Sequence, residues 1–205
     1  MPAHFRRTSV AATILIALGA SPSGTMAQEV ERPWTFRTGA LITGSSDTSL
    51  ERYKALSSIG LGMGVRRQIT GIFSAELNLA VLSREIVIEE ESGVESSQGS
   101  IETIPLNLLA QVRPLLEGVV HPYGGVGLNF TPVWEKTGAL DGDDIPPTFG
   151  VAAQLGVDFD LSPGVLLNLD LLWNTAEPDI EADGVRITTI TMNTFTLSAG
   201  VGFRF

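Results

Sequence analysis

Apolar and polar residues alternate strictly at the C-terminal end of the chain. From Phe195 to Phe205 every odd position is apolar, whereas the even positions carry Thr, Ser, Gly, Gly and Arg. A period of two is typical of a β-strand with one apolar and one polar face. Aromatic residues stand at both ends of the apolar face, which favours a strand that spans the hydrocarbon layer of an outer membrane.

The same alternation predicts seven further strands upstream. Each of them has one apolar face and one face that is polar or rich in glycine. They cover residues 34–43, 59–68, 73–82, 104–113, 122–131, 149–161 and 165–174. Together with residues 195–205 they make eight strands, each long enough to cross a thin outer membrane.

The connections between these strands alternate between short and long. Short links follow the second, fourth and sixth strands, and the long polar links are residues 44–58, 83–103, 132–148 and 175–193. A soluble β-sandwich has no reason to sort its loops in this way, whereas outer-membrane barrels have tight periplasmic turns and longer external loops. The sequence therefore predicts an all-β protein, an eight-stranded antiparallel transmembrane β-barrel whose N- and C-termini are periplasmic.

Aromatic residues on the apolar faces fall into two groups. Those at the short-turn ends are Trp34, Phe73, Phe159, Phe203 and Phe205, and those at the long-loop ends are Phe130, Phe149, Trp173 and Phe195. Two such girdles are expected where a barrel is anchored at both membrane–water interfaces. Phe203 and Phe205 also end the strand that must pair with the first strand, so we expect them to be the assembly signal for the barrel-insertion machinery.

The N-terminal residues predict export. A positive region with His4, Arg6 and Arg7 precedes an apolar run at 10–20, and small residues then lead to Ala27. This order is that of a secretory signal peptide. We expect residues 1–27 to be cleaved and residues 28–205 to form one barrel domain in the bacterial outer membrane. The apolar run is too short for a membrane-spanning helix, which needs about 20 residues.

Composition restricts the partners. Lys and Arg number 13 against 23 Asp and Glu, for a net charge of −10, so nucleic acid is not an expected partner. Cysteine is absent, which excludes disulfides. The acidic stretches at 89–91 and 141–144 lack the spacing of a calcium loop. We expect no metal and no cofactor, and outer-membrane lipids as the main partner.

Several stretches resemble the OmpW family of small outer-membrane barrels. They are HPYGGVGLNFT at 121–131, QLGVDFDLSPGVLLNLDLLW at 154–173 and GVGFRF at 200–205, and IPLNLLAQ at 104–111 is similar to the family's proline-containing fourth strand. The family's apolar–His segment near the second external loop has no counterpart in SREIVIEEESG, which begins at Ser83. The resemblance implies an eight-stranded, porin-like barrel that passes small hydrophobic molecules across the outer membrane and releases them sideways into the lipid.

Inward-facing residues are where function is expected. Gly60, Gly62 and Gly64 make one wall of the lumen nearly bare backbone, which either leaves room for one thin ligand or admits bulky side chains from facing strands. Pro105 and Leu109 face inward on the fourth strand. Because proline cannot donate to a ladder, Pro105 predicts either a lateral gap or a bulge at the barrel rim.

Charged and amide side chains form the second group of candidates. They share inward-facing positions, and they are Arg37, Arg66, Glu76, Gln111, Arg113, Asp158, Asp170 and Arg204. Unpaired charges in a dry interior are costly, so these groups are expected to form a paired network that plugs the lower lumen. An ion path through the lumen is the alternative interpretation.

We expect no enzymatic activity. Acyl chemistry needs a nucleophile with a base, usually histidine, and His121 alone remains after removal of the leader, at the periplasmic end. Two functions stay open: a passive channel or carrier for small hydrophobic molecules, and a structural or adhesive barrel without transport. An apolar cavity that opens through the barrel wall would distinguish them.

Overall fold

The computed structural model describes residues 32–44, 46–47, 53–89, 95–138, 146–176, 179–182, 185–189 and 192–205. Within these residues, no helix is long and apolar enough to cross a membrane. The predicted signal peptide lies outside the described residues, as do the acidic stretch at 141–144 and residues 90–91 of the other acidic stretch.

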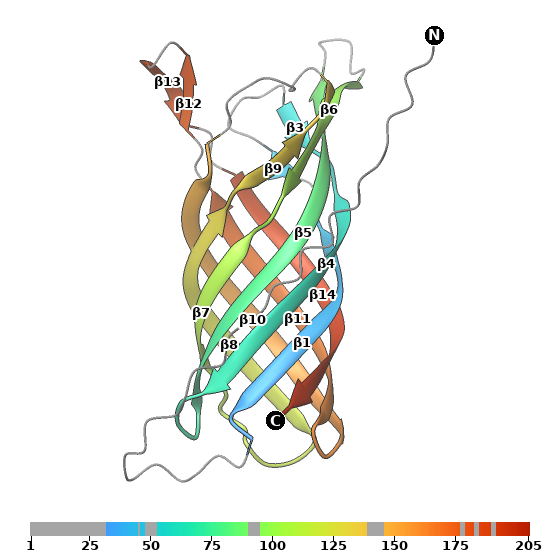
Figure 1. The fold of residues 1–205 in the computed structure, drawn as a ribbon, viewed down its shortest axis with the longest axis vertical. Coiled ribbons are helices and arrows are strands. Elements are labelled where there is room, and N and C mark those ends of the chain that lie inside the picture. Colours follow the sequence, from blue (N-terminus) through green and yellow to red (C-terminus); the bar gives the residue numbers. More distant parts are fainter. Residues whose placement is uncertain are drawn as a thin grey trace.

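Eight strands form a closed ring (Figure 1). In ring order they are β1 (Trp34–Thr43), β4 (Ser58–Gln68), β5 (Phe73–Glu89), β7 (Leu106–Val112), β8 (Val120–Thr131), β10 (Thr148–Ser162), β11 (Val165–Ala176) and β14 (Met192–Arg204). All neighbours are antiparallel, and β14 pairs with β1 to close the ring. The predicted eight-stranded antiparallel β-barrel is confirmed, and each of the eight predicted strands corresponds to one strand of the ring.

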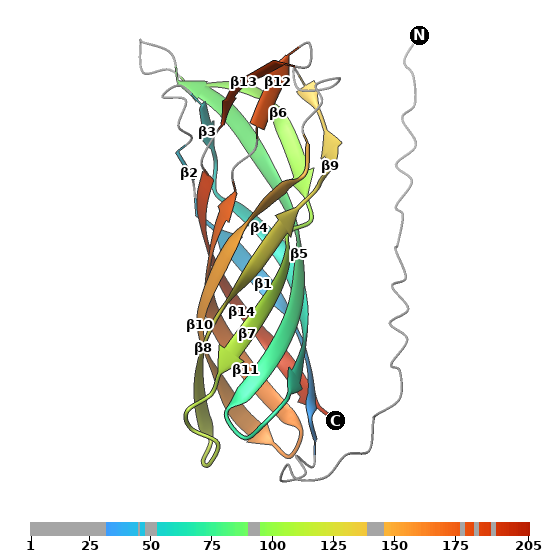
Figure 2. The same ribbon diagram turned by 90° about the vertical axis from the view of Figure 1, so that its left-hand side faces the viewer.

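The two ends of the barrel differ. At the short-turn end, which also holds the C-terminus, residues 69–72, 113–119 and 163–164 connect the strands. At the opposite, long-loop end lie β2 (Ser46–Asp47), β3 (Tyr53–Ala55), β6 (Glu95–Thr103), β9 (Val133–Lys136), β12 (Asp179–Ala182) and β13 (Val185–Thr189), as Figure 2 shows.

The prediction of a long loop over residues 83–103 is wrong. β5 continues to Glu89 and pairs with β6, with a register shift between Ile86 and Val87. Leu82, Arg84 and Val87 are buried, so the segment keeps a strand's alternation, with the shift displacing it by one residue. Polar composition concealed this strand because backbone ladders form between polar strands as readily as between apolar ones.

Apolar side chains cover the outside of the ring, and polar side chains fill the inside. Leu61 and Leu155 are 71% and 68% exposed, whereas the inward-facing Arg66 is 1% exposed. A continuous apolar belt around a closed barrel is a lipid-facing surface. The inward and outward assignments that alternation predicts for these positions are confirmed.

Backbone hydrogen bonds close the barrel at the short-turn end. The Phe205 N–H donates to the Trp34 carbonyl at 3.0 Å, and the Trp34 N–H donates to the Phe205 carbonyl at 3.1 Å. The last residue of the chain therefore completes the ladder between β14 and β1.

Candidate functional site

A network of ion pairs spans the half of the lumen nearer the short turns. Asp158 is fully buried at its centre. Its carboxylate oxygens lie 2.5 Å from Arg66, 3.2 Å from Arg113 and 3.8 Å from Arg37. Asn168 donates a further hydrogen bond to Asp158 at 2.9 Å. We call this network the plug; it also includes Glu76, Gln111, Gln154, Asp170 and Tyr123.

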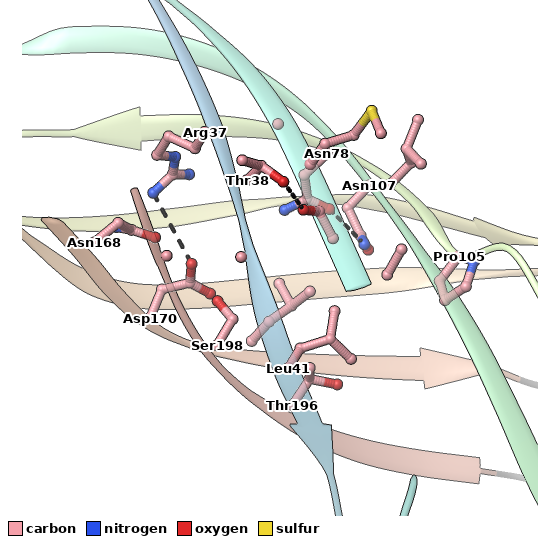
Figure 3. A pocket seen from close by; sticks show the side chains of 18 of the residues that line it. Arg37, Thr38, Leu41, Asn78, Pro105, Asn107, Asn168, Asp170, Thr196 and Ser198 are labelled. Carbon is pink, nitrogen blue, oxygen red and sulfur yellow. Dashed lines mark hydrogen bonds and ion pairs between the residues drawn. The ribbon is translucent and has the colours of Figure 1, made fainter. Parts of the chain in front are cut away.

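Glu76 extends the plug to the other side of the lumen. It pairs with Arg37 and accepts a hydrogen bond from Gln111 at 2.8 Å, and Gln111 also donates to Gln154 at 2.6 Å. Nη1 of Arg37 lies 3.9 Å from Oδ2 of Asp170, on the side of the plug that faces the long loops (Figure 3). Three guanidiniums thus face three carboxylates, and the charges of the plug balance. Paired charges of this kind stabilise a buried site only when the partners are all present.

Tyr123 is a central residue of the plug that sequence reasoning missed. Its hydroxyl oxygen accepts hydrogen bonds from Arg37 at 2.5 Å and from Asn168 at 2.8 Å. The guanidinium carbons of Arg37 and Arg66 lie 5.2 Å and 5.5 Å from its ring centroid, within cation–π range. The ring occupies the space that a side chain at Gly156 would need. Its inward position on β8 was readable from alternation, and that was the available signal.

Arg204 is brought to a different cluster. Its guanidinium donates to Asp160 at 2.7 Å, and the same carboxylate oxygen lies 3.1 Å from Nε2 of His121. Nδ1 of His121 is 3.1 Å from the Leu115 carbonyl oxygen. This partly exposed group lies at the short-turn end and holds the connection between β7 and β8 against β10.

A cavity of about 70 Å³ lies on the side of the plug that faces the long loops (Figure 3). Among the residues predicted to meet a ligand, Gly62, Gly64 and Pro105 line it. Its other walls combine apolar and neutral polar side chains, including Leu41, Leu82, Leu172, Asn174 and Thr196. Two of the predicted residues on β4 and Pro105, which precedes β7, therefore meet at one space.

Gly60 and Leu109 lie outside this lining. The space beside Gly60 is filled by neighbouring strands, because a Cβ there would overlap the Val81 carbonyl oxygen and would lie 2.8 Å from Leu82 Cδ2 and 3.1 Å from Leu41 Cδ1. Leu109 is packed in a buried apolar cluster with Ala152 and Leu172. At Gly60 the bare backbone thus admits bulky side chains, whereas at Gly62 and Gly64 it borders the cavity.

Pro105 separates β6 from β7, and this is why β7 begins later than predicted. Leu79 pairs with Leu106 on one side of the break and Leu82 pairs with Thr103 on the other, in one unchanged register. The proline therefore introduces no bulge.

Two prolines weaken the ladders at this level of the wall. Ala80 donates its N–H to the Pro105 carbonyl at 3.1 Å, but proline has no N–H to return to Ala80. On the other side, Ile104 donates to the Pro132 carbonyl at 3.2 Å, and Pro132 again returns none. We call the stretch of wall around Pro105 and Pro132 the proline seam.

Residues 37–205 match the model of the OmpW family. The chain belongs to the OmpW family. Solved structures with the same fold include OprG from Pseudomonas aeruginosa, with 19% identity and a TM-score of 0.65 over 85% of this chain and 96% of that one. Another is AlkL in DMPC bilayers, with 20% identity and a TM-score of 0.63 over 93% and 97%. A third is the E. coli outer membrane protein W, with 20% identity and a TM-score of 0.51 over 85% of this chain and 98% of that one.

No curated protein matches the chain. At these identities the solved structures establish the fold, and together with the family they place this OmpW-family barrel in the bacterial outer membrane. The predicted family and location are confirmed. The lumen of this barrel holds the plug near the short turns, a small cavity between the plug and the long loops, and the proline seam beside the cavity.

Proposed function

We propose that this OmpW-family barrel is a passive channel or carrier for small hydrophobic molecules, which enter at the long-loop end and leave sideways through the proline seam. The observation that carries the proposal is the position of the cavity. Its floor borders the plug through Arg37 and Glu76, and its wall includes Pro105. Because paired charges close the floor, a molecule in the cavity leaves through the wall or returns.

The level of the seam fits release into lipid. Leu106, which follows Pro105, pairs with Phe130 on β8. The Phe130 ring centroid lies 4.7 Å from that of Phe149, in the aromatic group at the long-loop end. Aromatic girdles mark the membrane–water boundary, so a molecule that leaves here reaches the edge of the hydrocarbon layer.

The cavity is small in this conformation. Its 70 Å³ is about half of the roughly 150 Å³ of an apolar cavity that binds benzene. Larger ligands therefore require side chains to move. Leu41 and Leu82 are the side chains expected to do so, since their ends rest against the bare backbone of Gly60. Rotamer changes of this kind leave the ladders intact.

The proposal includes an orientation. We infer that the short-turn end faces the periplasm, that residues 1–27 are removed as a signal peptide, and that the insertion machinery reads Phe203 and Phe205. Two features support this orientation. The short turns lie at this end of the barrel, and so do the beginning of β1 and the end of β14.

Two substitutions test the route. A Cβ at position 62 would lie 3.0 Å from Leu41 Cδ2 and 3.6 Å from the nearest backbone atom, so the Cβ of Gly62→Leu meets only a side-chain end, and the rest of the leucine is expected to fill the cavity. Pro105→Val gives the ladder an N–H opposite Ala80 without changing the plug. Both variants should lower the uptake of toluene into cells with surface abundance preserved, whereas Pro114→Val, in an exposed short turn, should not.

Uptake equal to that of the parent in both variants would contradict the proposal. It would favour the second candidate, a structural or adhesive barrel without transport. The paired charges of the plug and the small volume of the cavity are the observations that favour this candidate.

A further inference from the structure

We propose that the outer part of the lumen holds a binding site for a carboxylate, centred on the guanidinium of Arg84, and that the ligands of this barrel are amphiphiles with an anionic head and a short apolar tail. The tail's exit through the proline seam rests on the proposed function. The head-group site stands on observations of its own.

Arg84 is a buried guanidinium that pairs with no carboxylate among the described residues. It lies on the inward face of β5 and is 7% exposed. Its Nη1 donates to the Thr194 hydroxyl at 3.4 Å, and its Nε is buried with no partner. Among the described residues no carboxylate lies within ion-pair distance of it, whereas Arg37, Arg66 and Arg113 each meet one. An uncompensated buried charge is costly, and the planar fork of guanidinium donors fits a carboxylate.

Neutral polar side chains lie around the lumen near this level. Thr43 pairs in register with Ser58 on one side and with Thr196 on the other, and the two threonine hydroxyls are 3.2 Å apart. Ser58 Oγ and Asn174 Oδ1 are buried with no partner. These groups offer hydrogen bonds and no competing negative charge.

This polar collar is continuous with the cavity. Asn174 and Thr196 line the cavity. Asn174 pairs in register with Thr194, the residue that accepts the hydrogen bond from Arg84. The hydrogen-bond partner of Arg84 is therefore paired in register with a residue of the cavity lining.

The distance along β5 sets the length of the tail. Arg84 lies four residues beyond Ala80, whose N–H bonds to Pro105, and this corresponds to about 13 Å at a strand's rise of roughly 3.3 Å per residue. Leu82 lies between them on the same face and is buried. A head group held by Arg84 thus directs an apolar tail past Leu82 toward the proline seam. An inorganic anion would use only the first part of this arrangement.

Octanoate and octanamide provide the test, because they share length and shape and differ in charge. Binding is measured calorimetrically on the full barrel in nanodiscs, with protein-free nanodiscs as the blank. The parent should bind octanoate roughly tenfold more tightly than octanamide. Arg84→Gln should remove this preference, and Arg84→Lys should keep part of it. Arg67→Gln, at an exposed outward position beside Trp34, is the matched control and should change nothing.

Equal binding of the two probes to the parent, or an undiminished preference in Arg84→Gln, would overturn the inference. Acetate carries the head without the tail, so acetate binding as tight as that of octanoate would overturn the amphiphile assignment. Vesicle uptake separates the two proposals. If octanoate binds through Arg84 but neither probe crosses, the transport proposal fails and the head-group site stands. If the barrel speeds octanamide uptake over that of protein-free vesicles but binds octanoate no more tightly than octanamide, the head-group site fails and the transport proposal stands.

Discussion

Asp158→Asn is expected to destabilise the barrel by about 3–5 kcal/mol, because it removes one partner from a buried ionic network. Asp158 is fully buried, and three guanidiniums lie within 3.8 Å of its carboxylate. Asparagine has nearly the same size and still accepts a hydrogen bond from Asn168. The substitution therefore leaves the packing and removes the charge, so that three guanidiniums face two carboxylates.

Burial decides this magnitude, and Asp160 provides the matched comparison. The Asp160 side chain is 27% exposed and pairs with Arg204 at 2.7 Å. Ion pairs open to solvent contribute about 0–1 kcal/mol, so Asp160→Asn should cost about 1 kcal/mol or less. Adding Arg66→Gln to Asp158→Asn restores the balance of charge and should recover part of the lost stability.

Reversible urea unfolding in lipid vesicles measures these differences. A loss of 3 kcal/mol shifts the folding equilibrium by more than about 100-fold, well within the range of such a titration. If Asp158→Asn lowers the free energy of unfolding no more than Asp160→Asn does, the plug is solvated and does not block the axial route.

Three other predictions concern the membrane, assembly and topology. Leu169→Arg, on the lipid-facing side of β11, should cost about 2–4 kcal/mol near the midplane, and Leu161→Arg at the short-turn end about 0–1 kcal/mol; equal costs in vesicle titrations would contradict the lipid-facing belt. Deleting Phe205 removes both backbone bonds to Trp34 and should leave protease-sensitive chain in the periplasm, whereas a normal yield of folded barrel would contradict its closing role. Epitope tags within 139–145 should be labelled on intact cells and a tag at Pro163 should not, and labelling at Pro163 would reverse the orientation.

The fold was predictable because every strand of the ring carries its own signal. In 34–43, for example, alternation alone fixes the boundaries of β1 and places Arg37 and Leu41 inward, as the structure has them. Alternation failed as a guide at 83–103, where both strands of the β5–β6 hairpin extend beyond the apolar belt. There, no apolar face marks the lipid side, and a strand has the composition of a loop.

The site was predictable only in part, since alternation tells which side chains face the lumen but not which of them meet. Meeting depends on height within the barrel, which the register between neighbouring strands sets. Arg204 and Arg66 are both inward, yet register brings Arg66 to Asp158 and leaves Arg204 beside Asp160. Arg84 is not predictable for another reason: its segment has the composition of a loop, from which no inward direction follows.

The contrast between the two halves of the lumen supports a functional role for the upper one. Atoms without partners occur in both, but in the plug they belong to side chains such as Arg66 and Arg113, whose guanidiniums each meet a carboxylate. In the half nearer the long loops, the described residues provide no partner for Ser58 Oγ or Asn174 Oδ1 and no carboxylate for Arg84. A binding site leaves polar groups for its ligand to complete, and these are the groups that the proposed ligand would bind.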